Sequence, residues 1–321
     1  MNTIQLKMEH LFFQRNKVAD FQVQIENATV TMESNYNLLV IVLKGKSIEK
    51  LNELMLDMLS VLFLYLGGYP KIVEIRENNK IIDISNILNK FYTQDYFIKN
   101  NLAICKIDDT TINAAVLAKF KTINQLPIYS LQYLVSENYK SITSTHKITL
   151  LLHIIDGIVP DSTPGLEAEI KRKYHVNGNI GKYLPKVYYL CKYYFFNYES
   201  KYNCEILKIL NETEYSFLRK ITDTRNANSH FLNSNKKIHR MEDGDEVLRY
   251  FQILYYSIRL CLIDKLKVQT EENWIVEYLY CIYDWISTLQ NSSFVSFKSE
   301  TYKRKKAFDD FFDCVNTLKR V

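Results

Sequence analysis

The spacing of apolar residues changes character near residue 108, and this change constrains the fold more than any other feature. Before it, apolar residues alternate with polar ones or form short runs, as they do in strands. After it, they recur every three or four positions, as they do in amphipathic helices. The sequence therefore predicts an α+β N-terminal domain over residues 1–108, a helical bundle over 109–290 and an amphipathic helical tail over 291–321. The chain as a whole is expected to be predominantly α-helical.

Local signals place the N-terminal elements. The segment Ile48–Leu66 has helical spacing, and Gly67-Gly68 directly after it would end that helix. Around it lie stretches with the alternation or the β-branched composition of strands. The predicted strands are 21–31, 38–43, the pair 71–76 and 80–84 as a hairpin, and 103–107.

Apolar stripes place the helices of the second region. In the stretch 245–267, for example, Phe251, Leu254 and Ile258 fall on one face, which predicts packing in a core. The same spacing recurs in each of the other stretches. The predicted helices cover 110–123, 127–138, 145–158, 163–174, 181–197, 203–225, 245–267 and 271–289, with a further helix in the tail near 301–319.

Composition narrows the class of protein. Only 8 Gly and 5 Pro occur in 321 residues, which argues against flexible linkers and turn-rich all-β folds. The formal charge of +5 is mild, so a nucleic-acid partner would need positive charge concentrated locally. We find neither a signal-peptide pattern nor an apolar run long enough to cross a bilayer, so we expect a cytoplasmic protein. Its 6 Cys form no C-x-x-C pair, and we expect neither a metal nor another cofactor.

Three short sequence patterns give only weak evidence for a phosphate-binding or metal-binding site. Gly45-Lys46-Ser47 lacks the first glycine of a phosphate-binding loop, because Val40 stands in its place. Asp161 with the Glu169-Ile170-Lys171 tripeptide imitates a metal-dependent nuclease, but the tripeptide has helical spacing instead of lying on a strand. His146, His153 and Asp156 share a helix face, which is more typical of a polar stripe than of a metal site.

The segment Arg225-Asn226-Ala227-Asn228-Ser229-His230 is more specific. Given the composition, Arg-Asn-x3-His is expected about 0.02 times by chance in this chain. Histidine titrates near neutral pH and serves as general acid or base, and arginine offers phosphate oxygens a charged, rigid fork. Asn226 precedes His230 by one helical turn and can orient its imidazole. Arg225 lies about 140° around the helix from His230, so two copies of the chain would bring the groups together better than one.

In this segment the chain resembles the HEPN superfamily of helical ribonucleases, whose signature is R-x(4–6)-H with a polar residue after the arginine. The long helix before the motif, the polar loop 233–245 and the amphipathic helix after it agree with that family. An α+β region ahead of the helices is similar to the ApeA-like branch, known for anti-phage defence. The resemblance implies a metal-independent endoribonuclease that cleaves RNA by attack of the 2′-hydroxyl, in defence or toxin-like growth arrest. It assigns His230 as general acid or base, Arg225 as phosphate clamp, Asn226 as orienting donor and Asp156 as accessory candidate.

The expected partners follow from this assignment. The substrate is RNA, with tRNA as one candidate, and the protein is expected to be a homodimer or a higher even oligomer. Residues 1–108 are expected to recognise a phage-derived or nucleotide trigger, or to hold the enzyme inactive. The alternative is a non-catalytic sensor or adaptor whose HEPN-like half serves only to dimerise. Basic residues near the motif are candidates for RNA contact: Arg219, Lys220, Lys236, Lys237 and Arg240.

Overall fold

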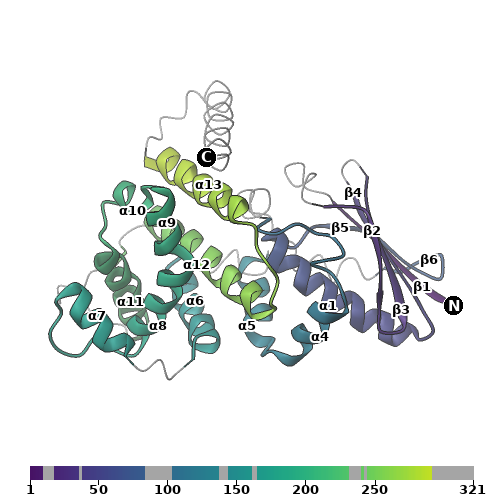
Figure 1. The fold of residues 1–321 in the computed structure, drawn as a ribbon, viewed down its shortest axis with the longest axis horizontal. Helices are drawn as coiled ribbons and strands as arrows, with labels where there is room; N and C mark the ends of the chain where they lie inside the picture. The colour runs from purple at the N-terminus through teal and green to yellow at the C-terminus, as the bar shows by residue number, and fades with distance from the viewer. Residues whose placement is uncertain are drawn as a thin grey trace, which may run out of the picture.

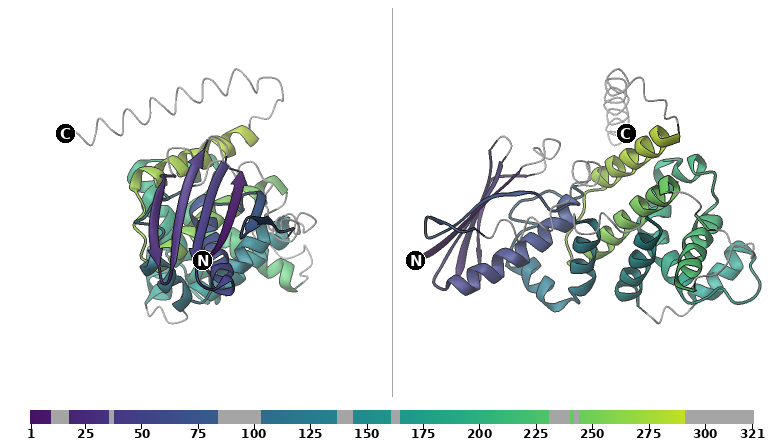
Figure 2. Two further views of the ribbon diagram at one scale, coloured as in Figure 1. Left: turned by 90° about the vertical axis from the view of Figure 1, so that its right-hand side faces the viewer. Right: turned by 180° about the vertical axis from the view of Figure 1, so that it is seen from behind.

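The computed structural model shows a β-sheet at one end of the molecule and packed helices at the other, with helix α1 between them (Figure 1). The same order is visible from behind in Figure 2. This arrangement confirms the predicted fold class, an α+β N-terminal part followed by a mainly helical region. The residues described are 1–9, 18–35, 38–83, 103–136, 144–160, 165–230, 240–241 and 244–290.

The sheet is antiparallel and has six strands in the order β2-β3-β4-β1-β5-β6. Its side chains alternate between two faces, so that Ile4 and Leu6 of β1 are buried while Gln5 between them is partly exposed. The buried face packs on α1, and the other face is turned away from the helices (left panel of Figure 2). The strands are β1 (Asn2–Glu9), β2 (Phe21–Ile25), β3 (Ala28–Asn35), β4 (Leu38–Gly45), β5 (Ile72–Glu77) and β6 (Lys80–Ile81).

Two strand predictions are wrong. The stretch 21–31 is a hairpin instead of one strand, because the chain turns at Glu26, whose φ of 53° lies in the left-handed region. Apart from the exposed Lys106, the stretch 103–107 is buried without being a strand, and among the described residues it makes one isolated bridge to the sheet region. It passes the end of α1, where the N–H of Ile104 donates to the carbonyl of Tyr65 at 3.1 Å. Burial against a helix, not strand pairing, explains its apolar composition.

Helix α1 (Ile48–Leu66) has the bounds that the sequence predicts. The hydroxyl of Ser47 accepts the N–H of Lys50, and Gly67 ends the helix in a left-handed conformation with φ 73°. Every residue from Met58 to Leu66 is buried. This happens because the last turns of α1 are enclosed by helices as well as by the sheet. The Gly-Lys-Ser pattern thus contributes a helix cap here, not a phosphate-binding loop.

The remaining helices mostly follow the prediction. The exception is 203–225, which is two helices because Thr213 caps a new one: its Oγ1 accepts the N–H of Ser216 at 3.1 Å. None of the described helices is long and apolar enough to cross a membrane. The helices are α4 (Ala114–Thr122), α5 (Leu126–Val135), α6 (Ser144–Ile158), α7 (Leu166–Tyr174), α8 (Tyr183–Cys191), the π-helix η4 (Lys192–Phe196), α9 (Asn197–Tyr202), α10 (Ile206–Ile209), α11 (Glu214–His230), α12 (Gly244–Lys265) and α13 (Glu272–Gln290).

Helix α12 joins the helical part to the end of α1. The wholly buried guanidinium of Arg259 donates to the carbonyls of Leu64 at 2.7 Å and Tyr65 at 3.1 Å. Next to it, the hydroxyl of Tyr255 donates to the carbonyl of Gly67 at 2.7 Å. These bonds satisfy carbonyl groups that a helix end leaves without partners inside the helix. The hydrophobic core is therefore continuous across residue 108, and the domain boundary there stays a prediction. The predicted tail lies outside the described residues.

Candidate active site

Helix α11 carries the Arg-Asn-x3-His segment and is helical to its last residue, His230. It packs against α6 and α8, and α6 also packs against α12, so these four helices form the bundle that positions the segment. One face of α11 is buried through Phe217, Leu218 and Ile221. Arg225 and Asn226 follow at the edge of this face and are both half-buried.

Arg225 is held by Tyr183, the first residue of α8. The Nη2 atom of Arg225 donates to the Tyr183 hydroxyl at 2.9 Å, and its guanidinium carbon lies 4.2 Å from the centre of the Tyr183 ring. The Nη1 atom donates to Oδ1 of Asn226 at 3.3 Å. The Nε atom is buried and has no hydrogen-bond partner among the described residues. The guanidinium is thus fixed in place, and Nη1 and Nη2 each keep one N–H that these two bonds do not use and that could donate to an anion.

The position of His230 follows from the backbone of α11. Positions 226 and 230 are one turn apart on the same helical face, as the sequence predicts. Positions 225 and 230 are about 140° apart around the axis. The side chain of His230 lies outside the described part of the structure, so its contact with Asn226 stays a prediction.

Asp156 of α6 is bound by two lysines, Lys182 just before α8 and Lys186 in its first turn. Its carboxylate accepts a hydrogen bond from Lys182 at 3.2 Å and forms an ion pair with the buried Lys186. Burial opposes ionisation of Asp156, but the hydrogen bonds from Lys186 and Lys182 outweigh it and lower the pKa of the carboxyl. Lys182 immediately precedes Tyr183. Asp156 therefore anchors the turn that presents Tyr183 to Arg225. Its hydrogen bonds are to this turn and to α8, not to the Arg225–His230 motif.

Two residues of the predicted basic patch form ion pairs with acidic residues of the same chain. Lys220 forms ion pairs with Glu212 and Glu246, and these hydrogen bonds raise its pKa although burial acts in the opposite direction. Arg219 forms an ion pair with Asp223 at 3.0 Å. Lys220 therefore holds α11 to the start of α12, which argues against the predicted RNA contact for this residue.

Of the other predicted RNA contacts, Arg240 is exposed, whereas Lys236 and Lys237 lie outside the described residues. Arg240 immediately precedes Met241, whose N–H donates to Oγ1 of Thr224 at 2.9 Å. This bond returns the chain to α11 next to Arg225. Exposure leaves Arg240 available for the predicted contact.

The structure also tests the two weaker sequence patterns that resemble metal sites. Glu169 accepts hydrogen bonds from Tyr188 at 2.6 Å and Lys192 at 2.7 Å, and it lies on α7, so the helical interpretation of its tripeptide is confirmed. Asp161 lies outside the described residues. His146 and His153 are exposed on α6. Within the described segments, no group of three or more His, Cys, Asp and Glu side chains is arranged to hold a metal ion.

Comparison with known proteins agrees with this arrangement. Residues 163–272 match the family described as Apea-like HEPN. The match covers α7 to α12 and includes the whole Arg225–His230 segment, whereas α6 with Asp156 precedes it. No curated protein and no solved structure gave a match. The finding thus assigns residues 163–272, and with them the helix that carries Arg225 and His230, to an Apea-like HEPN domain.

Proposed function

We propose that this protein is a metal-independent endoribonuclease of HEPN type. The observation that carries the proposal is Arg225, half-buried within the matched HEPN segment and fixed by Tyr183 with donor capacity left over. A guanidinium fixed in this way is suited to phosphate oxygens, because it loses little side-chain entropy when they bind.

RNA cleavage by this route needs three functions. A base removes the proton of the ribose 2′-hydroxyl, a cation stabilises the negative charge that develops on the phosphorane oxygens, and an acid protonates the leaving 5′-oxygen. We assign the proton transfers to His230 and the charge stabilisation to Arg225. Asn226 would orient the imidazole of His230 or donate to the transition state. The products would carry 2′,3′-cyclic phosphate and 5′-hydroxyl ends.

A second copy of the chain would complete the site. Positions 225 and 230 point about 140° apart on one helix, so one copy presents both groups poorly to a single phosphate. Two α11 helices facing each other across a two-fold axis would bring an Arg225 of one copy toward a His230 of the other. We therefore propose a homodimer or a higher even oligomer acting in the cytoplasm.

Anti-phage defence is the proposed role, with toxin-like growth arrest as its outcome. Residues 1–108 would sense a phage-derived or nucleotide trigger, and RNA, tRNA among it, would be cut. The competing proposal is a sensor or adaptor in which the HEPN domain binds partners and does not cleave. The HEPN match favours both, and the spare donor capacity of Arg225 favours the enzyme.

The test is to incubate the purified full chain with total RNA from uninfected and from phage-infected cells in the presence of EDTA. We expect cleavage that follows the protein through successive chromatographic steps, and sequencing of the new termini should find cyclic phosphate and 5′-hydroxyl ends. Cleavage that EDTA abolishes would contradict a metal-independent enzyme. Absence of cleavage with both RNA samples, together with absence of new 5′-hydroxyl ends in infected cells, would favour the adaptor.

Tyr183 is expected to act on cleavage through Arg225. The Tyr183→Leu substitution removes both the ring and the hydroxyl from the guanidinium, and we expect a loss of cleavage rate of about 5- to 50-fold. Tyr183→Phe keeps the ring and should recover most of that loss. Tyr193→Leu, at an exposed tyrosine of η4, is the control and should leave the rate unchanged. Equal losses for Leu and Phe at position 183 would show that stacking does not position Arg225.

A further inference from the structure

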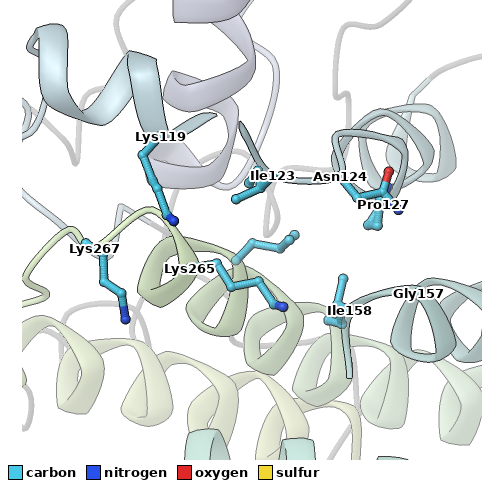
Figure 3. Close-up of a pocket in the computed structure, with 9 residues that line it drawn as sticks. Lys119, Ile123, Asn124, Pro127, Gly157, Ile158, Lys265 and Lys267 are labelled. Carbon is cyan, nitrogen blue, oxygen red and sulfur yellow. The ribbon is translucent and has the colours of Figure 1, made fainter. Parts of the chain in front are cut away.

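A cavity of about 330 Å³ lies where α4, α5, α6 and α12 meet. It is outside both the candidate active site and the N-terminal sheet. Figure 3 shows Lys119 and Lys267 on one side of it and Asn124, Pro127, Gly157 and Ile158 on the other, with the side chain of Lys265 running between them toward Ile158. Ile123 and Leu262 complete the lining.

The lining carries three lysines and no carboxylate. None of the three lysines has an ion-pair partner among the described residues. The acidic side chains close by in sequence or space face other groups: Asp264 accepts from Tyr194 at 3.1 Å, and Asp57 lies near Lys121. The lining of the cavity therefore carries net positive charge, which favours an anion.

Lysines at the end of a helix often serve only to offset the helix dipole, and Lys265 and Lys267 stand at the end of α12. Here, however, backbone amides already cap that end: the N–H of Lys267 donates to the Asp264 carbonyl at 2.9 Å and the N–H of Val268 to the Ile263 carbonyl. Lys267 itself has φ 60°, a left-handed conformation for which glycine is preferred. The Asp264 and Ile263 carbonyl groups are satisfied by backbone amides, so neither ammonium group is needed to cap them.

The other side of the cavity is apolar. Ile158, Pro127 and Ile123 offer hydrocarbon surface, and the amide of Asn124 adds one polar group beside them. Oδ1 of Asn124 accepts the N–H of Leu126 at 3.1 Å, so the NH₂ group is the part of this amide that is left to donate to a ligand. A ligand that fits would carry negative charge at one end and an apolar or aromatic body at the other. The volume is at the lower end of the range for small-molecule sites, roughly 300–1,000 Å³, which suits a single nucleotide unit and not an RNA strand.

We propose that this cavity binds a phosphorylated small molecule of mononucleotide size, with its phosphates on Lys119, Lys265 and Lys267 and its body against Ile158 and Pro127. The site goes beyond the proposed ribonuclease activity. It also lies outside residues 1–108, the region proposed to sense the trigger. Because α6 and α12 both line the cavity and both belong to the bundle around α11, the ligand would contact the helices that position Arg225.

The test is calorimetric titration of the full chain with ATP, pyrophosphate and adenosine. We expect ATP to bind more tightly than pyrophosphate and adenosine not to bind measurably. Lys265→Gln and Lys119→Gln should each weaken ATP binding by about tenfold or more, since each removes one charge-assisted contact. Lys44→Gln, at an exposed lysine of β4, should leave it unchanged. Gly157→Leu adds a side chain at the cavity wall without changing charge and should also abolish binding.

Several outcomes would overturn the proposal. These are no ATP binding by the wild type, unchanged binding in both lysine variants, or unchanged binding in Gly157→Leu with its thermal unfolding intact. If a short RNA, but not ATP, binds and loses affinity in the lysine variants, the lysines form part of an RNA surface instead. None of these measurements involves RNA cleavage, so they stand apart from the ribonuclease test.

Discussion

Alanine in place of His230 is expected to lower the rate of RNA cleavage by about 10²- to 10⁴-fold, because a positioned general acid or base contributes that much to proton transfer. Arg225→Ala should cost about 10²- to 10³-fold through lost stabilisation of the phosphorane charge. Arg225→Lys keeps the charge but removes the planar fork and its stacking on Tyr183, so it should remain at least about tenfold impaired. The measurement is single-turnover cleavage of a defined RNA.

The matched control is His153→Ala, which makes the same replacement at an exposed histidine of α6. It should retain the wild-type rate, and all variants should keep the wild-type circular dichroism spectrum. If His230→Ala cleaves as fast as His153→Ala, His230 has no part in the chemistry. If in addition the cells expressing it remain protected against phage, the adaptor becomes the better account of the protein.

Replacing Arg259 is expected to destabilise the whole chain. Arg259→Ala removes the donors to the Leu64 and Tyr65 carbonyls and leaves a void in a wholly buried position. Unpaired buried acceptors and a cavity together should lower the free energy of unfolding by about 3–5 kcal/mol. Arg259→Met fills most of the volume without the hydrogen bonds and should lose less. Burial lowers the pKa of this arginine, because the enclosed site disfavours its charged form.

Denaturant unfolding measures this effect as a shift of the midpoint at constant slope. Arg172→Ala, at an exposed arginine of α7, is the control and should change the free energy of unfolding by less than about 0.5 kcal/mol. A midpoint for Arg259→Ala close to that of Arg172→Ala would mean that the carbonyls at the end of α1 find other partners.

Local signals in the sequence were enough to predict much of the fold. Gly67 ends α1 as the sequence predicts, and Asn78 with Asn79, at φ 48° and 67°, forms the tight turn expected between β5 and β6. Strand β1 was not predicted, although Ile4, Leu6 and Met8 alternate in it. The sequence predicts one helix over 203–225, because the apolar spacing continues across the cap at Thr213.

The candidate site shows where sequence reasoning stops. Arg225, Asn226 and His230 were found because their spacing is rare within one segment. The sequence does not single out Tyr183, because it lies 42 residues from Arg225 along the chain. Nothing in the adjacent sequence distinguishes it from the other 23 tyrosines. The ion pair between Lys220 and Glu246 was missed for the same reason. Contacts set by tertiary packing leave no local pattern, and the lysine-lined cavity belongs to this class as well.

The bonds from Arg259 and Tyr255 to the end of α1 have a consequence for how such proteins diversify. Buried polar side chains of α12 have their hydrogen-bond partners at the end of α1, in the N-terminal part. The HEPN helices therefore cannot be exchanged between proteins as a free-standing unit. A recombinant that packed an unrelated segment on α12 in place of α1 would bury the Arg259 guanidinium without these carbonyl partners. Gene fusions that preserve function should therefore join outside the stretch from α1 to α12, or bring a substitute helix end whose carbonyl groups meet the same arginine.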